Sequence, residues 1–395
     1  MWWSKRMTYK YRLLPILLAF WLLMTSSGSA HHLSDSAMIS VITCGPGQPL
    51  YAAFGHTAIR VKDYENHLDL VFNYGTFDFK QRFFYLKFLT GKLEYSLTIS
   101  DFEEFYTEYV SENRNIYEQV LHFDKNLLNL IYDSLKINSL IEFRNYRYDF
   151  FEDNCTTRAM NIIVHFLPDS LRNEFFNQPV STTFRKEIEK AVGHRSWLMM
   201  GINILLGKYA DQPVSYKQSL FLPENFMKSL SKSQWAGEPK IIFENETQHT
   251  GRGSDFLFST SIVIWLLALL LIAEVLTSFT SQSFSDRTDI VLFALTGILG
   301  CLFLFLRIFS EHIPLQSNLN ILWANPLNLI ISVLLFTGWE KTAHFFIAIV
   351  VTGIAFCLVT WHHIPQHLPP DLMPILGLLA VRMLQRLFVF VKKPE

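Results

Sequence analysis

The sequence predicts an α+β soluble domain followed by an all-α membrane domain of about five helices. Residues 35–244 have the mixed polar and apolar composition of a soluble globular domain, whereas charged residues become rare and long apolar runs begin near position 256. With 395 residues, the chain is also long enough for two domains. Its net charge of -1 gives no reason to expect binding to nucleic acid.

The N-terminus has the pattern of an export signal. Basic residues between positions 5 and 12 precede an apolar run over 13–24, and small residues follow up to Ala30. This order predicts a signal peptide over residues 1–30 that is cleaved after Ala30. The alternative is an uncleaved membrane anchor, because the apolar run is only slightly too short to span a bilayer. Both interpretations export the residues that follow.

The soluble domain begins with three predicted strands. Residues 37–44 form the first, and the glycines and prolines of 45–49 force a turn after it. Residues 56–61 alternate as a second strand, 62–67 make a polar turn, and 69–74 return as a third. Because facing strands present every second side chain on one face, this hairpin is expected to place residues near His56 beside residues near Asn73.

Helices are predicted for most of the remaining soluble domain. Their expected ranges are 101–113, 124–139, 155–166, 182–192 and 197–206, with a strand over 116–123 and an extended stop over 221–223. The polar stretch that follows is expected to be a linker to the membrane. The predicted domains are therefore an exported soluble domain over 31–237, a linker over 238–255 and a membrane domain over 256–395.

Five apolar segments of the membrane domain are each about long enough to cross a bilayer. They are 256–276, 289–309, 320–339, 342–361 and 372–391, and Pro326 interrupts the third near its start. Five crossings from an outside domain leave the C-terminus inside, which agrees with the basic residues of the predicted inner loops and tail. Arg382 and Arg386 would be costly against lipid, so they are expected to face a cavity or to reach inward.

Cys155 is the candidate nucleophile. Asp153 or Asn154 can serve as the N-cap of the helix that follows, which puts the thiol in the first turn, where the positive end of the helix dipole stabilises an anion. A thiol there should be acidic, and the thiolate is the nucleophilic form. The alternative is a buried structural cysteine. Cys44 shares the soluble domain, but one distant pair is weak support for a disulfide, and the four cysteines show no zinc spacing.

His56 and Asn73 are the candidate partners of Cys155. A histidine on one strand, a polar residue on the next and a cysteine opening a later helix are the parts of a Cys-His-polar triad. In such a triad the imidazole takes the thiol proton, and the third group fixes its tautomer and orientation.

The blocks 54–61, 72–75 and 153–157 carry a resemblance to known families. Their order, with His before Cys, resembles the circularly permuted papain-like fold of the lecithin:retinol acyltransferase and NlpC type. Together with a signal peptide before and several spans after, the pattern resembles the Lnb family of bacterial lipoprotein N-acyltransferases. The resemblance covers essentially the whole chain, and it is most specific in the His and Cys blocks.

The resemblance assigns roles to individual residues. It implies that Cys155 is the nucleophile, His56 the base and Asn73 the orienting group. Proteins like lecithin:retinol acyltransferase usually have a histidine at the third position, so His67 in the turn is the alternative. For the oxyanion and the substrate, the candidates are the backbone N–H of Cys155 together with Tyr148, Asn154 and, in an outer loop of the membrane domain, His312.

The implied activity is acyl transfer at a membrane. A fatty acyl group would pass from a phospholipid or another acyl donor, through a thioester on Cys155, to the N-terminal cysteine amine of a lipoprotein acceptor. No cofactor and no metal is required. The implied location is the bacterial inner membrane, with multiple spans and the catalytic domain on the periplasmic side. Two alternatives are an exported cysteine peptidase or amidase acting on cell-wall peptides, and a non-catalytic adaptor anchored by its helices.

Overall fold

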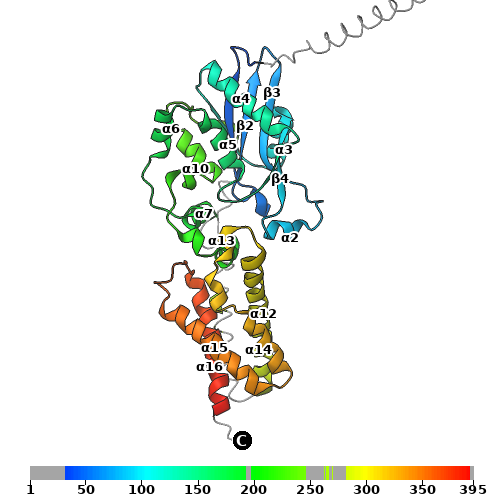
Figure 1. The fold of residues 1–395 in the computed structure, drawn as a ribbon, viewed down its shortest axis with the longest axis vertical. Coiled ribbons are helices and arrows are strands. Elements are labelled where there is room, and N and C mark those ends of the chain that lie inside the picture. The colour runs from blue at the N-terminus through cyan, green and yellow to red at the C-terminus, as the bar shows by residue number, and fades with distance from the viewer. Residues whose placement is uncertain are drawn as a thin grey trace, which may run out of the picture.

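The computed structural model describes residues 32–192, 197–245 and 282–391, together with a few helical residues between 262 and 269 (Figure 1). The predicted signal peptide, 1–30, lies outside the described residues, and so does most of the first predicted span, 256–276.

A seven-stranded antiparallel sheet forms the centre of the described soluble domain. Its spatial order is β6-β4-β3-β2-β1-β5-β7. The strands are β1 (Met38–Cys44), β2 (His56–Asp63), β3 (Leu68–Thr76), β4 (Glu94–Asp101), β5 (Ile116–Val120), β6 (Asn145–Arg147) and β7 (Lys240–Phe243). The predicted hairpin is confirmed, because β2 pairs with β3 in the register that sets Ile59 opposite Phe72. The strand β7 lies inside the predicted linker, so the sheet extends further along the chain than expected.

Helices cover both faces of the sheet. Residues Ile59 and Val61 of β2 point into the main core, which α4 (Lys125–Ser139) and α5 (Cys155–His165) close on one face. The preceding residue, Ala58, belongs to a smaller core on the other face, under α3 (Phe102–Ser111). This alternation is the expected result of the two-residue period of a strand. It fixes α5, and with it Cys155, against the start of β2.

A second cluster around Phe151, Phe184 and Phe221 includes α7 (Phe184–Val192), α8 (Trp197–Leu205) and the 3-10 turn Lys208–Asp211. Other helices of the described soluble domain are α2 (Phe84–Leu89), α6 (Asp169–Phe176), α9 (Tyr216–Ser219) and α10 (Pro223–Leu230), with a further 3-10 turn at Leu50–Ala52. An extended stop was predicted over 221–223. The backbone of Leu222 is extended, but Pro223 is already the first residue of α10. Proline suits that position, since its missing N–H would have no partner within the helix.

The C-terminal region is helical. Its elements are α12 (Gln282–Phe309), α13 (Ile313–Gln316), the 3-10 turn Leu319–Leu322, α14 (Pro326–Phe336), α15 (Glu340–Val359), the 3-10 turn Pro370–Leu372 and α16 (Met373–Val391). Among the described residues, Asp286–Phe309 and Glu340–Val359 are long and apolar enough to cross a membrane. The third predicted span is broken: Ile313–Leu322 and Pro326–Phe336 meet at a bend of 44° and together could make one further crossing.

Two glycines let α14 pack closely on α12. A Cβ atom added at Gly297 would lie 2.2 Å from the backbone nitrogen of Leu329, and one added at Gly300 would lie 2.4 Å from the carbonyl carbon of Asn325. Small residues at such contacts allow two backbones to approach in a membrane.

The two arginines of α16 are paired inside the helical bundle. Arg382 donates to Asp289 at 2.6 Å, Arg386 also donates to Asp289, and a further bond of 2.5 Å joins Arg386 to Asp286. Arg382 and Asp289 are both buried. These arginines, which were expected to face a cavity or to reach inward, are paired with two carboxylates of α12.

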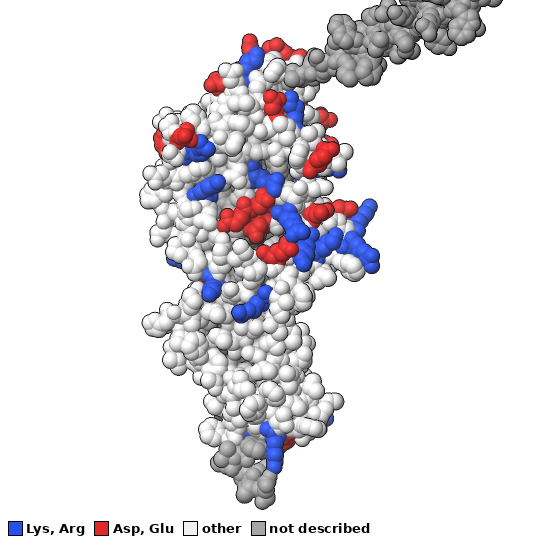
Figure 2. Space-filling view, in the orientation of Figure 1, with Lys and Arg blue, Asp and Glu red and all other residues white. Residues whose placement is uncertain are grey.

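The two regions are joined by backbone and side-chain hydrogen bonds. The N–H of Gly207 donates to the carbonyl of Pro314 at 2.7 Å, and the amide of Asn318 donates to the carbonyls of Ile204 and Leu205. Buried Arg185 ties α7 to the same joint, with a bidentate ion pair to Asp211. Figure 2 shows charged side chains over the soluble domain and an almost uncharged belt over the helices below it.

Candidate active site

The N-terminus of α5 holds Cys155 in a capped first turn. The side chain of Asn154 accepts hydrogen bonds from the N–H groups of Thr156 and Thr157, and the Thr157 hydroxyl accepts from the N–H of Asn154. The Asn154 amide group also donates to the carbonyls of Phe150 and Phe221. This confirms the predicted cap, with Asn154 in that position. Because both ends of its amide are engaged, Asn154 builds the turn, and its contact with the oxyanion or the substrate stays a prediction.

His56 and Asn73 meet at the same end of the sheet. The Nε2 atom of His56 lies 2.5 Å from Oδ1 of Asn73. An amide oxygen can only accept, so Nε2 carries the proton and Nδ1 is left to interact with the thiol. Tyr109 of α3 stacks on the imidazole, with ring centroids 6.0 Å apart. The amide and the tyrosine together fix the tautomer and the orientation of the histidine ring.

The Cys155 thiol is partly buried and acidic. Its burial acts to raise its pKa, but the charge of His56, a hydrogen bond with His56, the Thr57 N–H and the Thr156 hydroxyl outweigh burial and lower the pKa from 9.0 to about 7. The hydroxyls of Thr57 and Thr156 lie 3.0 Å apart and tie the start of α5 to the start of β2. A thiol with this pKa is substantially ionised at neutral pH.

Gly75 makes room for the thiol beside the imidazole. The β3–β4 register shifts between Tyr74 and Thr76, so Gly75 is the extra residue of a bulge, and its φ is +93°. A Cβ atom added there would lie 3.4 Å from Cβ of Cys155 and 3.9 Å from Cε1 of His56. A left-handed φ and this close approach both favour glycine.

Tyr146 is a second hydroxyl at this point. Its oxygen lies 3.9 Å from the same added Cβ position at Gly75. The hydroxyl is buried and has no hydrogen-bond partner among the described residues. Arg158 lies over the ring at 3.5 Å and is held by a bidentate ion pair to Asp153. Burial, with the charge of Cys155 adding to it, raises the pKa of Tyr146, so its hydroxyl keeps the proton that it could donate.

Tyr148, the tyrosine predicted to stabilise an oxyanion, stacks face to face on Tyr95 with ring centroids 4.3 Å apart. Burial raises its pKa, and the charge of Cys155 raises it further. It therefore lies near the thiol, one residue beyond β6.

The other two predicted histidines lie elsewhere. His67 is in the turn at the far end of the β2–β3 hairpin, a full strand length from His56, so it cannot orient that imidazole. His312 begins the short segment after α12, where Nε2 lies 3.1 Å from the carbonyl of Phe88 and Nδ1 lies 3.8 Å from a carboxylate oxygen of Asp149. This carboxylate also accepts from the N–H groups of Phe151 and Glu152 in the loop that leads to Cys155. The contacts of His312 therefore link the membrane domain to the loop before the thiol.

Cys44 is a free, buried thiol, and Cys155 is also free. Cys44 lies opposite His56 in the β1–β2 register, and burial raises its pKa far above that of Cys155. The pKa values of two thiols in the same domain are therefore shifted in opposite directions.

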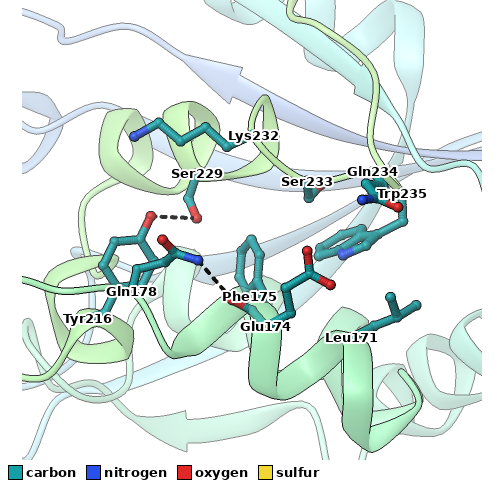
Figure 3. Close-up of a pocket in the computed structure, with 10 residues that line it drawn as sticks. All are labelled: Leu171, Glu174, Phe175, Gln178, Tyr216, Ser229, Lys232, Ser233, Gln234 and Trp235. Atoms are coloured by element: carbon teal, nitrogen blue, oxygen red, sulfur yellow. Dashed lines mark hydrogen bonds between the residues drawn. The ribbon is translucent and has the colours of Figure 1, made fainter.

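The described part of the chain also contains a cavity away from this site. Within the part of the chain that the structure describes, no three His, Cys, Asp or Glu side chains converge where they could hold a metal ion. The volume of this cavity is about 160 Å³. Its lining, drawn in Figure 3, comes from the α6 region, from Tyr216 and from the end of α10 and the turn after it: Leu171, Glu174, Phe175, Gln178, Tyr216, Ser229, Lys232, Ser233, Gln234 and Trp235. None of the predicted site residues lines it.

Comparison with known families follows the same two-part division. Residues 31–185 match the Lnb N-terminal periplasmic domain, and residues 252–394 match the Lnb transmembrane domain. The chain belongs to the Lnb family. No curated protein and no solved structure matches it. This member of the Lnb family is thus a membrane protein with a periplasmic N-terminal domain, and Cys155, His56 and Asn73 all lie within the part that matches the periplasmic domain.

Two residues of this Lnb site were missed in the sequence. Gly75 directly follows the strand predicted over 69–74, but the observed strand continues to Thr76, and a glycine inside a strand often marks a bulge. Tyr146 stands two residues from Tyr148 in the same aromatic run, and only the pairing of β6 with β4 determines which of the two is buried against Gly75.

Proposed function

We propose that this Lnb protein is a cysteine-dependent N-acyltransferase that moves a fatty acyl group from a membrane lipid to the N-terminal amine of a lipoprotein. The observation that supports it most is the arrangement of Cys155, His56 and Asn73, with the thiol pKa lowered to about 7, in a periplasmic domain fixed to a membrane domain. The order of the histidine strand before the cysteine helix also supports a circularly permuted papain-like fold, and the proposal keeps five spans in the inner membrane.

The first half-reaction forms a thioester. The Cys155 thiolate attacks the carbonyl carbon of a lipid ester, and the negative charge moves to the carbonyl oxygen. We propose two donors to this oxygen. The hydroxyl of Tyr146 has no hydrogen-bond partner among the described residues, and the N–H of Cys155 is not one of the two that bond to the Asn154 side chain. The C–O bond then breaks, the protonated His56 gives its proton to the leaving alkoxide, and a lysolipid departs.

The second half-reaction uses the amine as the nucleophile. The amine attacks the thioester carbonyl, neutral His56 accepts its proton, and the C–S bond breaks to release the amide and the Cys155 thiolate. Asn73 holds the imidazole through both steps, because the bond at Nε2 keeps Nδ1 directed at the thiol.

The membrane domain gives this chemistry its specificity. Donor and acceptor are both anchored in the bilayer, so holding the thiol on the same surface replaces an encounter in three dimensions by one in two. Exclusion of water also protects the thioester from hydrolysis.

The test is the mass of the N-terminal peptide of a host lipoprotein. The mass is compared in cells that lack this protein and in cells that carry the wild type, Cys155→Ser, His56→Ala or Cys44→Ser. The proposal expects one added acyl chain with the wild type and with Cys44→Ser, and none with the other two variants. Membrane extraction and thermal unfolding of each variant serve as the check that it is folded.

An unchanged mass in all strains would refute the proposal. Release of cell-wall peptides that depends on Cys155 would then identify a peptidase or amidase, while a Cys155 thiol that does not react with a lipid ester at neutral pH would indicate an adaptor. Loss of acylation on Cys44→Ser as well would overturn the assignment of Cys155 as the sole thiol nucleophile.

A further inference from the structure

The segment 77–93, which contains α2, exposes large apolar side chains at the base of the periplasmic domain. Phe79, Phe83, Tyr85, Leu86 and Phe88 are all exposed, and Tyr85 keeps 77% of its surface in solvent. Single exposed apolar residues are normal on a protein surface, but a contiguous group of five marks a binding surface.

Basic residues lie among these side chains. Lys80, Arg82, Lys87 and Lys92 belong to the segment, and Asp78 is its one acidic residue. Figure 2 shows lysine and arginine side chains gathered at the right-hand edge of the domain, where Figure 1 places α2. Aromatic side chains interleaved with lysine and arginine suit the boundary of a bilayer with acidic headgroups, where rings enter the acyl region and cations meet phosphate.

The end of α2 is bonded to the end of a membrane span. The carbonyl of Thr90 accepts from the N–H of Glu311 at 2.9 Å, and that of Leu89 accepts from the Ser310 hydroxyl at 3.0 Å. These two partners directly follow Phe309, the last residue of α12. Because Asp286–Phe309 of α12 is long and apolar enough to cross a membrane, these bonds hold the segment beside the end of a membrane-capable helix. In Figure 1, α2 projects sideways past α12, so it overhangs the surface beside the bundle.

The backbone at the start of α2 directs a ring outward. Phe83 has a φ of +59°, a left-handed conformation that is costly for a bulky residue. The neighbouring Phe84 is buried against Phe77 and Phe79, while the ring of Phe83 stays exposed. Strain of this kind persists where the surrounding structure imposes it, and here it keeps an aromatic side chain in the exposed group.

Ring contacts run from this segment to the candidate site. The ring of Phe84 packs on Phe77, with centroids 5.8 Å apart, and Phe77 packs on Tyr95 at 5.2 Å. Tyr95 in turn contacts Tyr148 and Tyr146. These packed rings therefore form a continuous apolar wall between the exposed segment and the hydroxyl beside Cys155, and Phe84, Tyr95 and Tyr146 within it are buried.

We infer that the segment 77–93 docks on the periplasmic leaflet of an acidic phospholipid membrane, and that a lipid held there reaches Cys155 along this wall. The docking does not depend on the chemistry at Cys155, whereas the use of the wall by an acyl donor rests on the proposed function.

Photocrosslinking of the full chain tests the docking. The photoreactive analogue p-benzoylphenylalanine replaces Tyr85, Tyr64 or Phe309 in a Cys155→Ala background, and the protein is reconstituted in vesicles of phosphatidylcholine with or without phosphatidylglycerol. Tyr64 is the matched control, because it is an exposed tyrosine in the turn at the opposite end of β2. Phe309 is the lipid-contact reference, as an exposed residue that ends α12. Since Cys155 is absent, failure of acyl transfer cannot affect the result.

The expected product is a phospholipid adduct at positions 85 and 309 and none at position 64. The yield at position 85 should rise severalfold with phosphatidylglycerol. That rise should disappear when Lys80, Lys87 and Lys92 are changed to Gln, but persist when Lys125, Lys217 and Lys232 are changed instead. A lipid adduct at position 309 without one at 85, or a crosslink from 85 to protein, would overturn the docking.

A kinetic experiment tests whether a lipid reaches Cys155 along the apolar wall. With Cys155 intact, Tyr85→Glu should raise KM for a lipid ester in vesicles severalfold while leaving the iodoacetamide labelling of Cys155 unchanged, and Tyr64→Glu should change neither. An unaltered KM with Tyr85→Glu would overturn the route to Cys155 even where the crosslinks support docking.

Discussion

Replacing His56 with alanine should make Cys155 far less acidic. Burial alone raises the pKa of this thiol, and His56 supplies the two largest opposing contributions, through its charge and its hydrogen bond. Without the imidazole, the pKa should therefore rise from about 7 to at least the ordinary value of 9.0. At pH 7 the thiolate would fall from about one half of the molecules to about one in a hundred, a loss of roughly 50-fold.

The assay is labelling by iodoacetamide as a function of pH, with the Cys155 peptide quantified by mass. A lowered pKa means that the reactive thiolate is present above the folded-state pKa and is lost as pH falls through it. The wild-type rate should therefore rise through a midpoint near 7 and then level off. The midpoint is a better measure than the rate at one pH, since a more basic thiolate is also intrinsically more nucleophilic and offsets part of the loss.

Two residues of the same chain, His67 and Cys44, serve as controls. His67→Ala removes a histidine at the opposite end of the same hairpin and should leave the midpoint near 7. The labelling of Cys44 is measured in the same samples. Cys44 should stay unlabelled in the folded protein, because it is buried and its pKa is raised. A midpoint near 7 in His56→Ala, or an equal shift in His67→Ala, would refute the thiol–imidazole reasoning.

Three further variants test the surroundings of the thiol. Gly75→Ala places a Cβ 3.4 Å from that of Cys155 at a φ of +93°, so it should lower the unfolding free energy by about 1–2 kcal/mol and also reduce acyl transfer. Gly338→Ala, at a φ of +80° in open space, should show the stability loss alone, and equal losses of activity would contradict the steric argument. Tyr146→Phe removes a hydroxyl that has no partner among the described residues, so thermal unfolding and thiol labelling should not change while turnover falls about 100-fold; unchanged turnover would exclude the oxyanion role. Asn154→Ala removes both cap bonds and leaves the carbonyls of Phe150 and Phe221 without their donor, so it should cost about 2 kcal/mol or more in thermal unfolding, and a neutral effect would contradict its structural role.

The local parts of the site were predictable from the sequence. A capping residue before an apolar helical stretch is a signal within a few positions, and it placed Cys155 correctly as the first residue of α5. The hairpin needed only a polar turn between two alternating strands, and its pairing brings His56 to Asn73. Short-range patterns were sufficient here because the contacts themselves are short-range in sequence or follow from a single register.

The parts that depend on distant pairing were not predictable. Strand β7 lies more than a hundred residues from its partner β5, and its four residues carry no signal that separates them from a linker. The six residues of α2 lie in an aromatic run without a helical period, so the segment 77–93 gave no prediction. His312 was expected near a substrate because it is polar and outside the membrane, but its contacts with Phe88 and Asp149 depend on how the two domains meet.

The joint between the two domains is rigid. Gly207 is pressed so closely against Ser317 that an added Cβ would lie 2.5 Å from its carbonyl oxygen, and Asn318 and Arg185 lock the adjoining turns. A hinge at this place would need all of these bonds to break together. Under the proposed function, this rigid joint would hold the thiol at one height above the bilayer and would favour acceptors whose reactive atoms stand at a matching distance from the membrane plane. An amine attached directly to an anchored lipid stands at one fixed distance from that plane, whereas the many amines of soluble peptides have no defined level at all.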